Sequence, residues 1–127
     1  MAETNKVILI VEDELSLRNA LRDKLRHEGF GTLEAKDGEE GLQLALSQRP
    51  DLILLDLVMP KMDGIAMLKQ MKNDEQWGKK AKVIILTNLN DYDKLAEVMT
   101  LGTYDYLVKS DWKIGDVLKK IKDKFGM

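Results

Sequence analysis

One stretch decides the fold: Asp51-Leu52-Ile53-Leu54-Leu55-Asp56, which is followed at once by a loop at residues 57–64 that contains a proline and a glycine. A short apolar run bounded by turn residues is typical of a strand buried on both faces, as in a parallel sheet. Asp56 would then lie where the strand leaves the core. Open α/β sheets bind their ligands at this carboxyl edge.

Strand and helix patterns alternate along the rest of the chain. Further buried-strand patterns lie at residues 7–11, 32–35, 83–86 and 104–108. Helical spacing follows each strand; Leu17, Leu21 and Leu25 show it first, and the last helical pattern has the fullest apolar stripe.

Details of three segments can be predicted as well. Asp37 with Glu40 indicates a helix N-cap. In the fourth helical pattern we expect Leu95, Val98 and Met99 to face inward, and residues 73–82 are polar enough to be a loop.

Five strand patterns alternating with five helical ones predict right-handed crossovers and a parallel sheet covered on both faces. The expected fold is a flavodoxin-like, doubly wound (βα)5 unit with strand order 2-1-3-4-5. The length of 127 residues predicts one domain over residues 1–127, with its core at 6–125.

Composition excludes several classes of function. The net charge of −2 favours neither nucleic acid nor a membrane surface as a partner, and the apolar runs are too short to cross a bilayer. The absence of cysteine excludes disulfides, thiol nucleophiles and thiolate metal sites. We therefore expect a cytoplasmic protein.

Four of the five strand patterns end in chemically useful groups: Glu12-Asp13, Asp56, Thr87 and Lys109. The predicted strand order places the first and third strands side by side, so Asp13 would meet Asp56. Crowded carboxylates need a counter-charge, and Mg²⁺ is a hard cation that takes carboxylate oxygens. Asp56 could then act as a nucleophile that forms an acyl phosphate, with Thr87 and Lys109 on the phosphoryl oxygens.

Each of these residues alone has an ordinary explanation. Acids after a strand often cap the next helix, Thr87 suits a turn, and a lysine at a strand end is usually solvated. Their joint occurrence at the ends of different strands favours a functional site.

Together these residues resemble the receiver domain of bacterial two-component response regulators, most closely the single-domain, chemotaxis-regulator-like kind. The resemblance covers residues 6–125. Its motifs are Val11-Glu12-Asp13, Leu55-Asp56 with Met59-Pro60-Lys61-Met62-Asp63-Gly64, Leu86-Thr87 and Tyr106-Leu107-Val108-Lys109.

The resemblance implies that Asp56 accepts a phosphoryl group from a histidine kinase, a phosphotransfer protein or a small phosphodonor. Mg²⁺ would be bound by Asp13, Asp56 and the backbone carbonyl of Val58, with Glu12 acting largely through water. Thr87 and Lys109 would hold the phosphoryl oxygens. Such a protein is not an enzyme in the ordinary sense, but it assists its own phosphorylation and dephosphorylation.

The resemblance also implies a switch and an output surface. Thr87 and Tyr106 would relay phosphorylation to a face formed by the fourth helix, the last strand and the last helix, where a target protein binds. The chain would be a monomer or a phosphorylation-dependent dimer. Candidate contact residues on that face are Tyr92, Lys94, Met99, Tyr106, Trp112, Lys113 and Lys119.

Three residues depart from the family pattern. Ser110 replaces the usual proline after Lys109, and a cis bond before a non-proline residue costs about 2.5–4 kcal/mol, which favours a trans bond here. Asn88 stands where a small residue is usual, and Val58 cannot position water. We expect Val58 and Asn88 to limit access to Asp56 and to slow hydrolysis of its phosphoryl group.

Other functions remain open at this point. A Mg²⁺-dependent phosphatase that forms an aspartyl phosphate would show D-x-D after the first strand, whereas this strand ends Val11-Glu12-Asp13-Glu14. A flavin- or nucleotide-binding module would need a phosphate-binding loop in the same place. A receiver-fold scaffold with an impaired switch is the third alternative.

Overall fold

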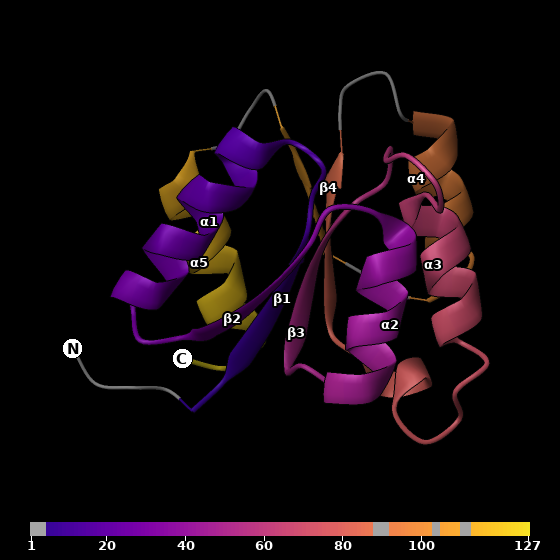
Figure 1. The fold of residues 1–127 in the computed structure, drawn as a ribbon, viewed down its shortest axis with the longest axis horizontal. Coiled ribbons are helices and arrows are strands. Elements are labelled where there is room, and N and C mark those ends of the chain that lie inside the picture. Colours follow the sequence, from indigo (N-terminus) through magenta and orange to yellow (C-terminus); the bar gives the residue numbers. More distant parts are fainter. Residues whose placement is uncertain (1–4, 88–91, 103–104, 110–112) are drawn as a thin grey trace.

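The computed structural model describes residues 5–87, 92–102, 105–109 and 113–127, except for the side chains of Lys79 and Tyr92. Figure 1 shows strands alternating with helices along the chain. The strands are β1 (Val7–Val11), β2 (Gly31–Ala35), β3 (Leu52–Asp56), β4 (Val83–Thr87) and β5 (Asp105–Val108). The helices are α1 (Leu15–His27), α2 (Gly38–Gln48), α3 (Gly64–Met71), α4 (Tyr92–Met99) and α5 (Ile114–Lys124).

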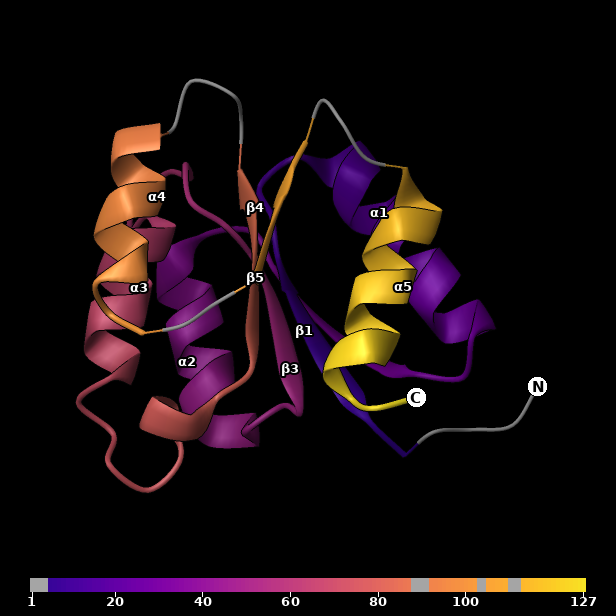
Figure 2. The same cartoon turned by 180° about the vertical axis from the view of Figure 1, so that it is seen from behind.

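The five strands form one parallel sheet in the order β2-β1-β3-β4-β5, which confirms the predicted flavodoxin-like fold. Helices α1 and α5 cover one face, and α2, α3 and α4 cover the other (Figures 1 and 2). All of the residues of β3 are buried, as its unbroken apolar run predicts. Leu52 and Leu54 belong to the core beneath α1 and α5, whereas Ile53 and Leu55 belong to the opposite core.

The strand register sets the level of the carboxyl edge. Val11 pairs with Leu55, Asp56 pairs with Leu86, and Thr87 pairs with Val108. The residues that end β1, β3, β4 and β5 therefore lie within one or two positions of a common line. This register brings the predicted site residues together.

Of three local predictions, the cap of α2 was confirmed, the inward position of Met99 was wrong, and the loop at residues 73–82 contains one short helical turn. The Asp37 carboxylate accepts a hydrogen bond from the Glu40 N–H at 2.8 Å and caps α2 as expected. Met99 does not face inward: 37% of it is exposed, whereas Val98 is fully buried. The stretch 73–82 contains a turn of 3-10 helix at Gly78–Lys80, where the Lys80 N–H donates to Trp77 O.

No helix in the described parts of the chain combines the length and apolar character that a membrane crossing requires.

Candidate functional site

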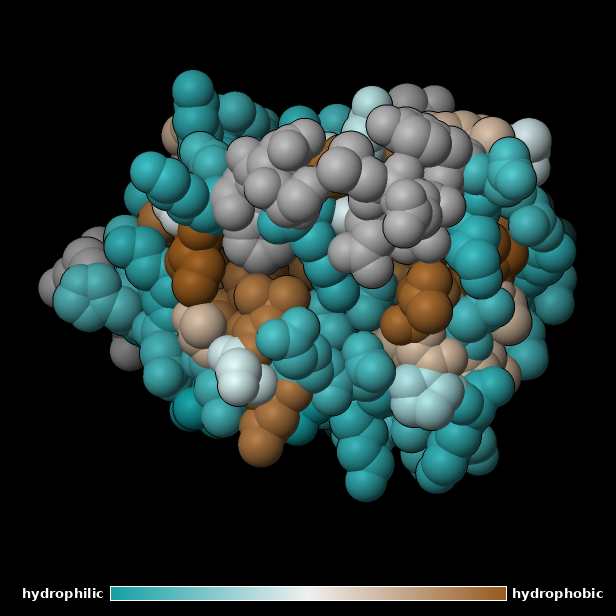
Figure 3. All heavy atoms as spheres, turned by 90° about the horizontal axis from the view of Figure 1, so that it is seen from above, coloured by the Kyte–Doolittle hydropathy of each residue, from teal (hydrophilic) through white to brown (hydrophobic). Residues whose placement is uncertain are grey.

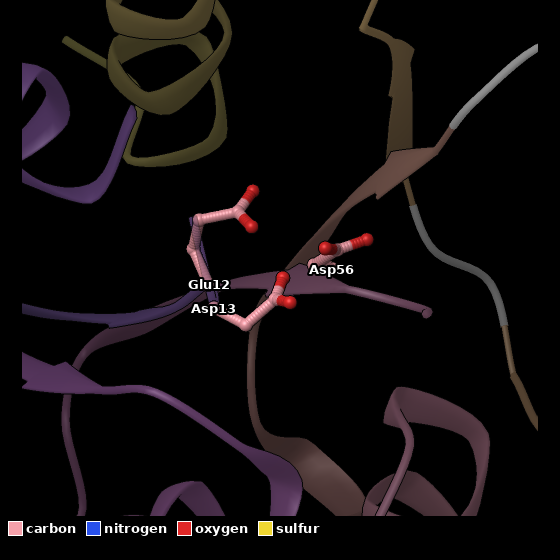
Figure 4. A group of neighbouring side chains, drawn as sticks. All are labelled: Glu12, Asp13 and Asp56. Carbon is pink, nitrogen blue, oxygen red and sulfur yellow. The ribbon is translucent and has the colours of Figure 1, made fainter. Parts of the chain in front are cut away.

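Three carboxylates meet at the carboxyl edge of the sheet. Glu12 and Asp13 follow β1, and Asp56 ends β3 (Figure 4). One oxygen of each lies within 4.8 Å of the corresponding oxygens of the other two. Glu12 is fully buried and Asp56 is 3% exposed, whereas Asp13 faces solvent. The strand order thus brings together the acids whose proximity the sequence pattern predicts.

Lys109 reaches this group from the end of β5. Its Nζ lies 3.0 Å from Asp56 Oδ2 and 2.7 Å from Glu12 Oε1. Its backbone N–H donates to Thr87 O at 2.6 Å, which continues the β4–β5 pairing by one residue. The ammonium therefore lies between two buried carboxylates and provides their nearest counter-charge.

The two oxygens of Glu12 are held differently. Oε2 accepts a hydrogen bond from the Glu14 N–H at 3.1 Å. Oε1 is buried and forms an ion pair with Lys109, but it has no well-aligned hydrogen bond within the described residues. A buried carboxylate oxygen with unused lone pairs is able to accept a further cation or donor.

Burial dominates the proton affinities of the two buried acids, Glu12 and Asp56. It raises the pKa of Glu12 to about 7, which the Lys109 ammonium opposes and the charge of Asp56 reinforces. Burial also raises the pKa of Asp56, against the nearby Lys109 charge. For Lys109, burial alone would lower the pKa, but the neighbouring carboxylates of Glu12 and Asp56 outweigh it and raise the pKa. The cluster has more negative charge than one lysine balances.

The donor set fits a hard divalent cation. It consists of carboxylate oxygens, one of them on the exposed Asp13 and one, Glu12 Oε1, without an aligned donor. Mg²⁺ prefers one or two carboxylates together with water and phosphate oxygens, and its charge offsets the repulsion among the acids. The residues present therefore suit Mg²⁺, the ion that the sequence motifs predict.

The remaining predicted residues lie around the acids. Thr87 is 2% exposed and ends β4, one position after the register partner of Asp56. The Val58 N–H donates to Asp56 Oδ1 at 3.3 Å, and 44% of Val58 is exposed. Tyr106 on β5 is also 44% exposed. Asn88, Ser110 with its peptide bond to Lys109, and Trp112 lie outside the described residues.

Two neighbours of the site escaped sequence reasoning. Arg18 Nη1 donates to the Glu12 backbone carbonyl at 2.8 Å, although Arg18 matches an ordinary polar position of an amphipathic helix. Leu15, at the start of α1, is 59% exposed. Figure 3 looks onto this end of the molecule and shows hydrophobic patches among hydrophilic residues. In the sequence, Leu15 follows the three acids at 12–14 directly, and this was the one sign that an apolar residue lies near the site.

A family model described as the response regulator receiver domain matches residues 8–122. The chain belongs to this family. Receiver domains are the phosphoacceptor modules of two-component signalling systems and are not enzymes in the classical sense. The family and the fold expected from the motifs are thereby confirmed.

Relatives of known structure or function agree. The chain is 37% identical over 105 residues to the sporulation initiation phosphotransferase F of Bacillus subtilis, covering 83% of this chain and 82% of that protein. It is 26% identical, with a TM-score of 0.85, to the receiver domain of a sensor histidine kinase from Pseudomonas aeruginosa, covering 99% and 100% of the two chains. That structure has a magnesium ion coordinated in its active-site cleft.

Other relatives are longer proteins. The alkaline phosphatase synthesis transcriptional regulatory protein of Bacillus subtilis is 38% identical over 106 residues, which is 83% of this chain but 42% of that protein. The chain spans about two fifths of the length of such transcriptional regulators. Similarity to them therefore concerns the receiver portion.

Proposed function

We propose that Asp56 is the phosphoacceptor and that its reaction depends on Mg²⁺ held by Asp13, Asp56 and the Val58 carbonyl, with Glu12 acting through water. The observation that carries the proposal is the position of Asp56: it is 3% exposed, 3.0 Å from the Lys109 ammonium, and grouped with Glu12 and Asp13. The donor would be a histidine kinase, a phosphotransfer protein or a small phosphodonor.

The chemistry follows from this arrangement. An Asp56 carboxylate oxygen attacks the phosphorus of the donor, a new O–P bond forms, and the donor group leaves with the electron pair of the bond that breaks. Bound Mg²⁺ supplies positive charge to the phosphoryl oxygens and to the crowded acids. Lys109 turns from Asp56 to a phosphoryl oxygen, and the Thr87 hydroxyl donates to another. The chain thus assists its own phosphorylation and dephosphorylation.

A relay to the surface is the second part of the proposal. Thr87 and Lys109 are joined by a backbone hydrogen bond at the ends of β4 and β5, and Tyr106 lies three residues before Lys109. When Thr87 moves toward the phosphoryl group, the half-exposed Tyr106 ring can turn inward and change the α4-β5-α5 face. A target protein would bind there, with contacts drawn from Lys94, Met99, Lys113 and Lys119.

The setting proposed for this switch is the cytoplasm, with protein partners and neither nucleic acid nor a membrane as a binding partner. The chain would act as a monomer or as a dimer formed on phosphorylation. The protein relatives that bear the name of transcriptional regulators match over only part of their length, so their whole activity is not carried over to this chain.

Counting phosphate separates this proposal from its alternatives. The protein is incubated with excess acetyl phosphate and Mg²⁺, and the phosphate bound and released per chain is measured over time. A receiver holds at most one phosphoryl group per chain and releases it slowly. Rapid release of many phosphates per chain would indicate a phosphatase. Neither binding nor release would indicate a flavin- or nucleotide-binding module, or a scaffold with an impaired switch.

Mg²⁺ binding should strengthen as the pH rises through about 7. Below this value Glu12 holds a proton, because burial raises its pKa to about 7, and the charge of a bound metal ion favours release of that proton. Above it the carboxylate is already charged, so the affinity levels off. Titration calorimetry between about pH 6 and pH 8, in buffers of different ionisation heat, measures both the affinity and the proton release. Equal affinity and no proton release across this range would contradict the expectation.

Val58→Asn should speed loss of the phosphoryl group about tenfold, which corresponds to ~1.4 kcal/mol of barrier. Val58 lies beside Asp56 with an exposed apolar side chain, so an amide in its place can hold an attacking water. Val58→Leu is the matched control and should leave the rate unchanged. Decay of the phosphorylated protein after removal of acetyl phosphate gives the rate, and equal decay of Val58→Asn and the original chain would refute this role of Val58.

A further inference from the structure

The loop that follows Asp56, residues 57–63, is closed on itself at its base. The Gly64 N–H donates to Leu57 O at 3.0 Å, and Asp63 caps α3 by accepting from the Ala66 N–H at 2.9 Å. A Cβ on Gly64 would lie 2.5 Å from Asp56 O, so the end of the loop rests against the backbone of Asp56 itself. A shift of this end of the loop would therefore also displace the backbone of Asp56.

A second contact ties Met62, near the end of the same loop, to α2. The N–H of Gly38, the first residue of α2, donates to Met62 O at 2.8 Å. The first N–H groups of a helix have no partner within the helix, and here a loop carbonyl accepts one of them. The Asp37 side chain satisfies another of these groups at Glu40. We call the Gly38–Met62 hydrogen bond the α2 latch.

Only glycine permits this approach. A Cβ on Gly38 would collide with Met62 O and would lie 2.7 Å from the carbonyl carbon of Met62. These are backbone atoms, so no side-chain rotation relieves the collision, and the loop or the helix would have to move. Beside the latch, Lys61 has a left-handed backbone with φ of 64°, a strained conformation that the surrounding contacts must maintain.

The latched loop carries the groups that touch the site. Val58 donates its N–H to Asp56 Oδ1, and its carbonyl is the proposed backbone ligand of Mg²⁺. A backbone ligand has no rotatable side chain with which to adjust, so its position depends on what holds the loop. The base of the loop is held by Gly64, and the latch fixes Met62 against a helix that packs on β1.

We propose that the α2 latch is a positioning device for the metal site and that Gly38 is a positioning residue. It holds loop 57–63 so that the Val58 carbonyl and the Asp56 carboxylate face the same ion. The inference rests on the proposed function, since it assumes that Mg²⁺ binds at Asp13, Asp56 and Val58. Its consequence is that metal affinity depends on a residue of α2 that has no side chain and touches neither the metal nor the phosphoryl group.

Three glycine-to-alanine variants test the role of the latch. Gly38→Ala breaks it. Gly78→Ala introduces the same kind of collision, with the backbone carbonyl of Met71, but at the other end of α3 and away from the site. Gly115→Ala in α5 adds a methyl group that meets nothing within 4 Å. The first two variants should lose comparable stability. A difference in Mg²⁺ affinity between them therefore reflects the latch and not a general loss of stability.

Titration calorimetry with Mg²⁺ alone measures the outcome. We expect Gly38→Ala to bind Mg²⁺ about tenfold more weakly, in the range found for partners that orient metal ligands. Gly78→Ala and Gly115→Ala should keep the affinity of the original chain. At saturating Mg²⁺, Gly38→Ala should still take one phosphoryl group from acetyl phosphate. Unchanged affinity in Gly38→Ala, or equal losses in Gly38→Ala and Gly78→Ala, would overturn the proposal.

Hydrogen exchange of the unaltered chain tests the same coupling without a variant that has to fold. By reciprocity, Mg²⁺ must stabilise the latch by the factor by which the latch strengthens Mg²⁺ binding. Saturating Mg²⁺ should therefore slow exchange of the Gly38 amide about tenfold more than exchange of the Gly31 amide, which is bonded to Lys6 O at the opposite edge and reports only the general stabilisation by the metal. Equal effects on both amides would overturn the latch. Failure of the original chain to bind Mg²⁺ would overturn the proposed function instead.

Discussion

We expect Asp56→Asn to abolish phosphorylation by acetyl phosphate. An amide oxygen is too weak a nucleophile to form the acyl phosphate, and the substitution keeps the size of the side chain. The fold should survive, because burial raises the pKa of Asp56 and a neutral group is easier to bury at this position. Intact-mass measurement after incubation with acetyl phosphate and Mg²⁺ gives the phosphorylated fraction.

Asp51→Asn is the matched control at the other end of the same strand. The Asp51 carboxylate accepts a hydrogen bond from the Val7 N–H at 2.7 Å, and an amide oxygen can still accept it. This variant should be phosphorylated as fully as the original chain. Phosphorylation of Asp56→Asn to the same extent would mean that another residue is the acceptor.

Lys109→Ala should lower the free energy of unfolding by about 3–5 kcal/mol in the absence of metal. Removing one member of a buried ion pair leaves its partner uncompensated, and such losses fall in this range. Here two carboxylates, on the fully buried Glu12 and on Asp56, would lose their nearest cation. Urea unfolding at about pH 8 measures the loss, because this pH is above the raised pKa of Glu12 in the original chain and both acids are charged there.

Lys124→Ala is the control for this prediction. Its Nζ lies 3.1 Å from Asp105 Oδ2 near the surface, where an ion pair contributes only about 0–1 kcal/mol. Saturating Mg²⁺ should restore part of the stability of Lys109→Ala, because the ion replaces the missing positive charge, but should not affect Lys124→Ala in this way. A loss in Lys109→Ala no greater than in the control would contradict the structural role of Lys109.

The fold was predictable because its main signals are local. Residues 52–55 are apolar without interruption, and the strand they form is buried on both faces. Met99 shows the limit of such patterns. Successive side chains on a helix point about 100° apart, so Met99 is partly exposed where its neighbour Val98 is fully buried. The turn at Gly78–Lys80 is too short to show a period.

The site was predictable as a set of residues, but its geometry was not. Strand order alone places Asp13 near Asp56, because β1 and β3 are neighbours in the sheet. Glu12 is buried although the adjacent Asp13 is exposed, and Lys109 extends across the end of β4 to reach Glu12. These features depend on side-chain conformations, which a hydrophobic pattern in the sequence does not predict. In the sequence, nothing distinguishes Gly38 from an ordinary first residue of a capped helix. Its contact with Met62 joins segments that are distant in sequence.

The most direct test is to identify the residue that carries the phosphoryl group. The protein is incubated with acetyl phosphate, with Mg²⁺ or with a chelator, the acyl phosphate is reduced with borohydride, and the peptides are analysed by mass spectrometry. The account predicts one modified residue, Asp56, and modification only when Mg²⁺ is present. Modification of Asp13 or Glu12 instead, or equal modification of Asp56 with the chelator, would contradict it.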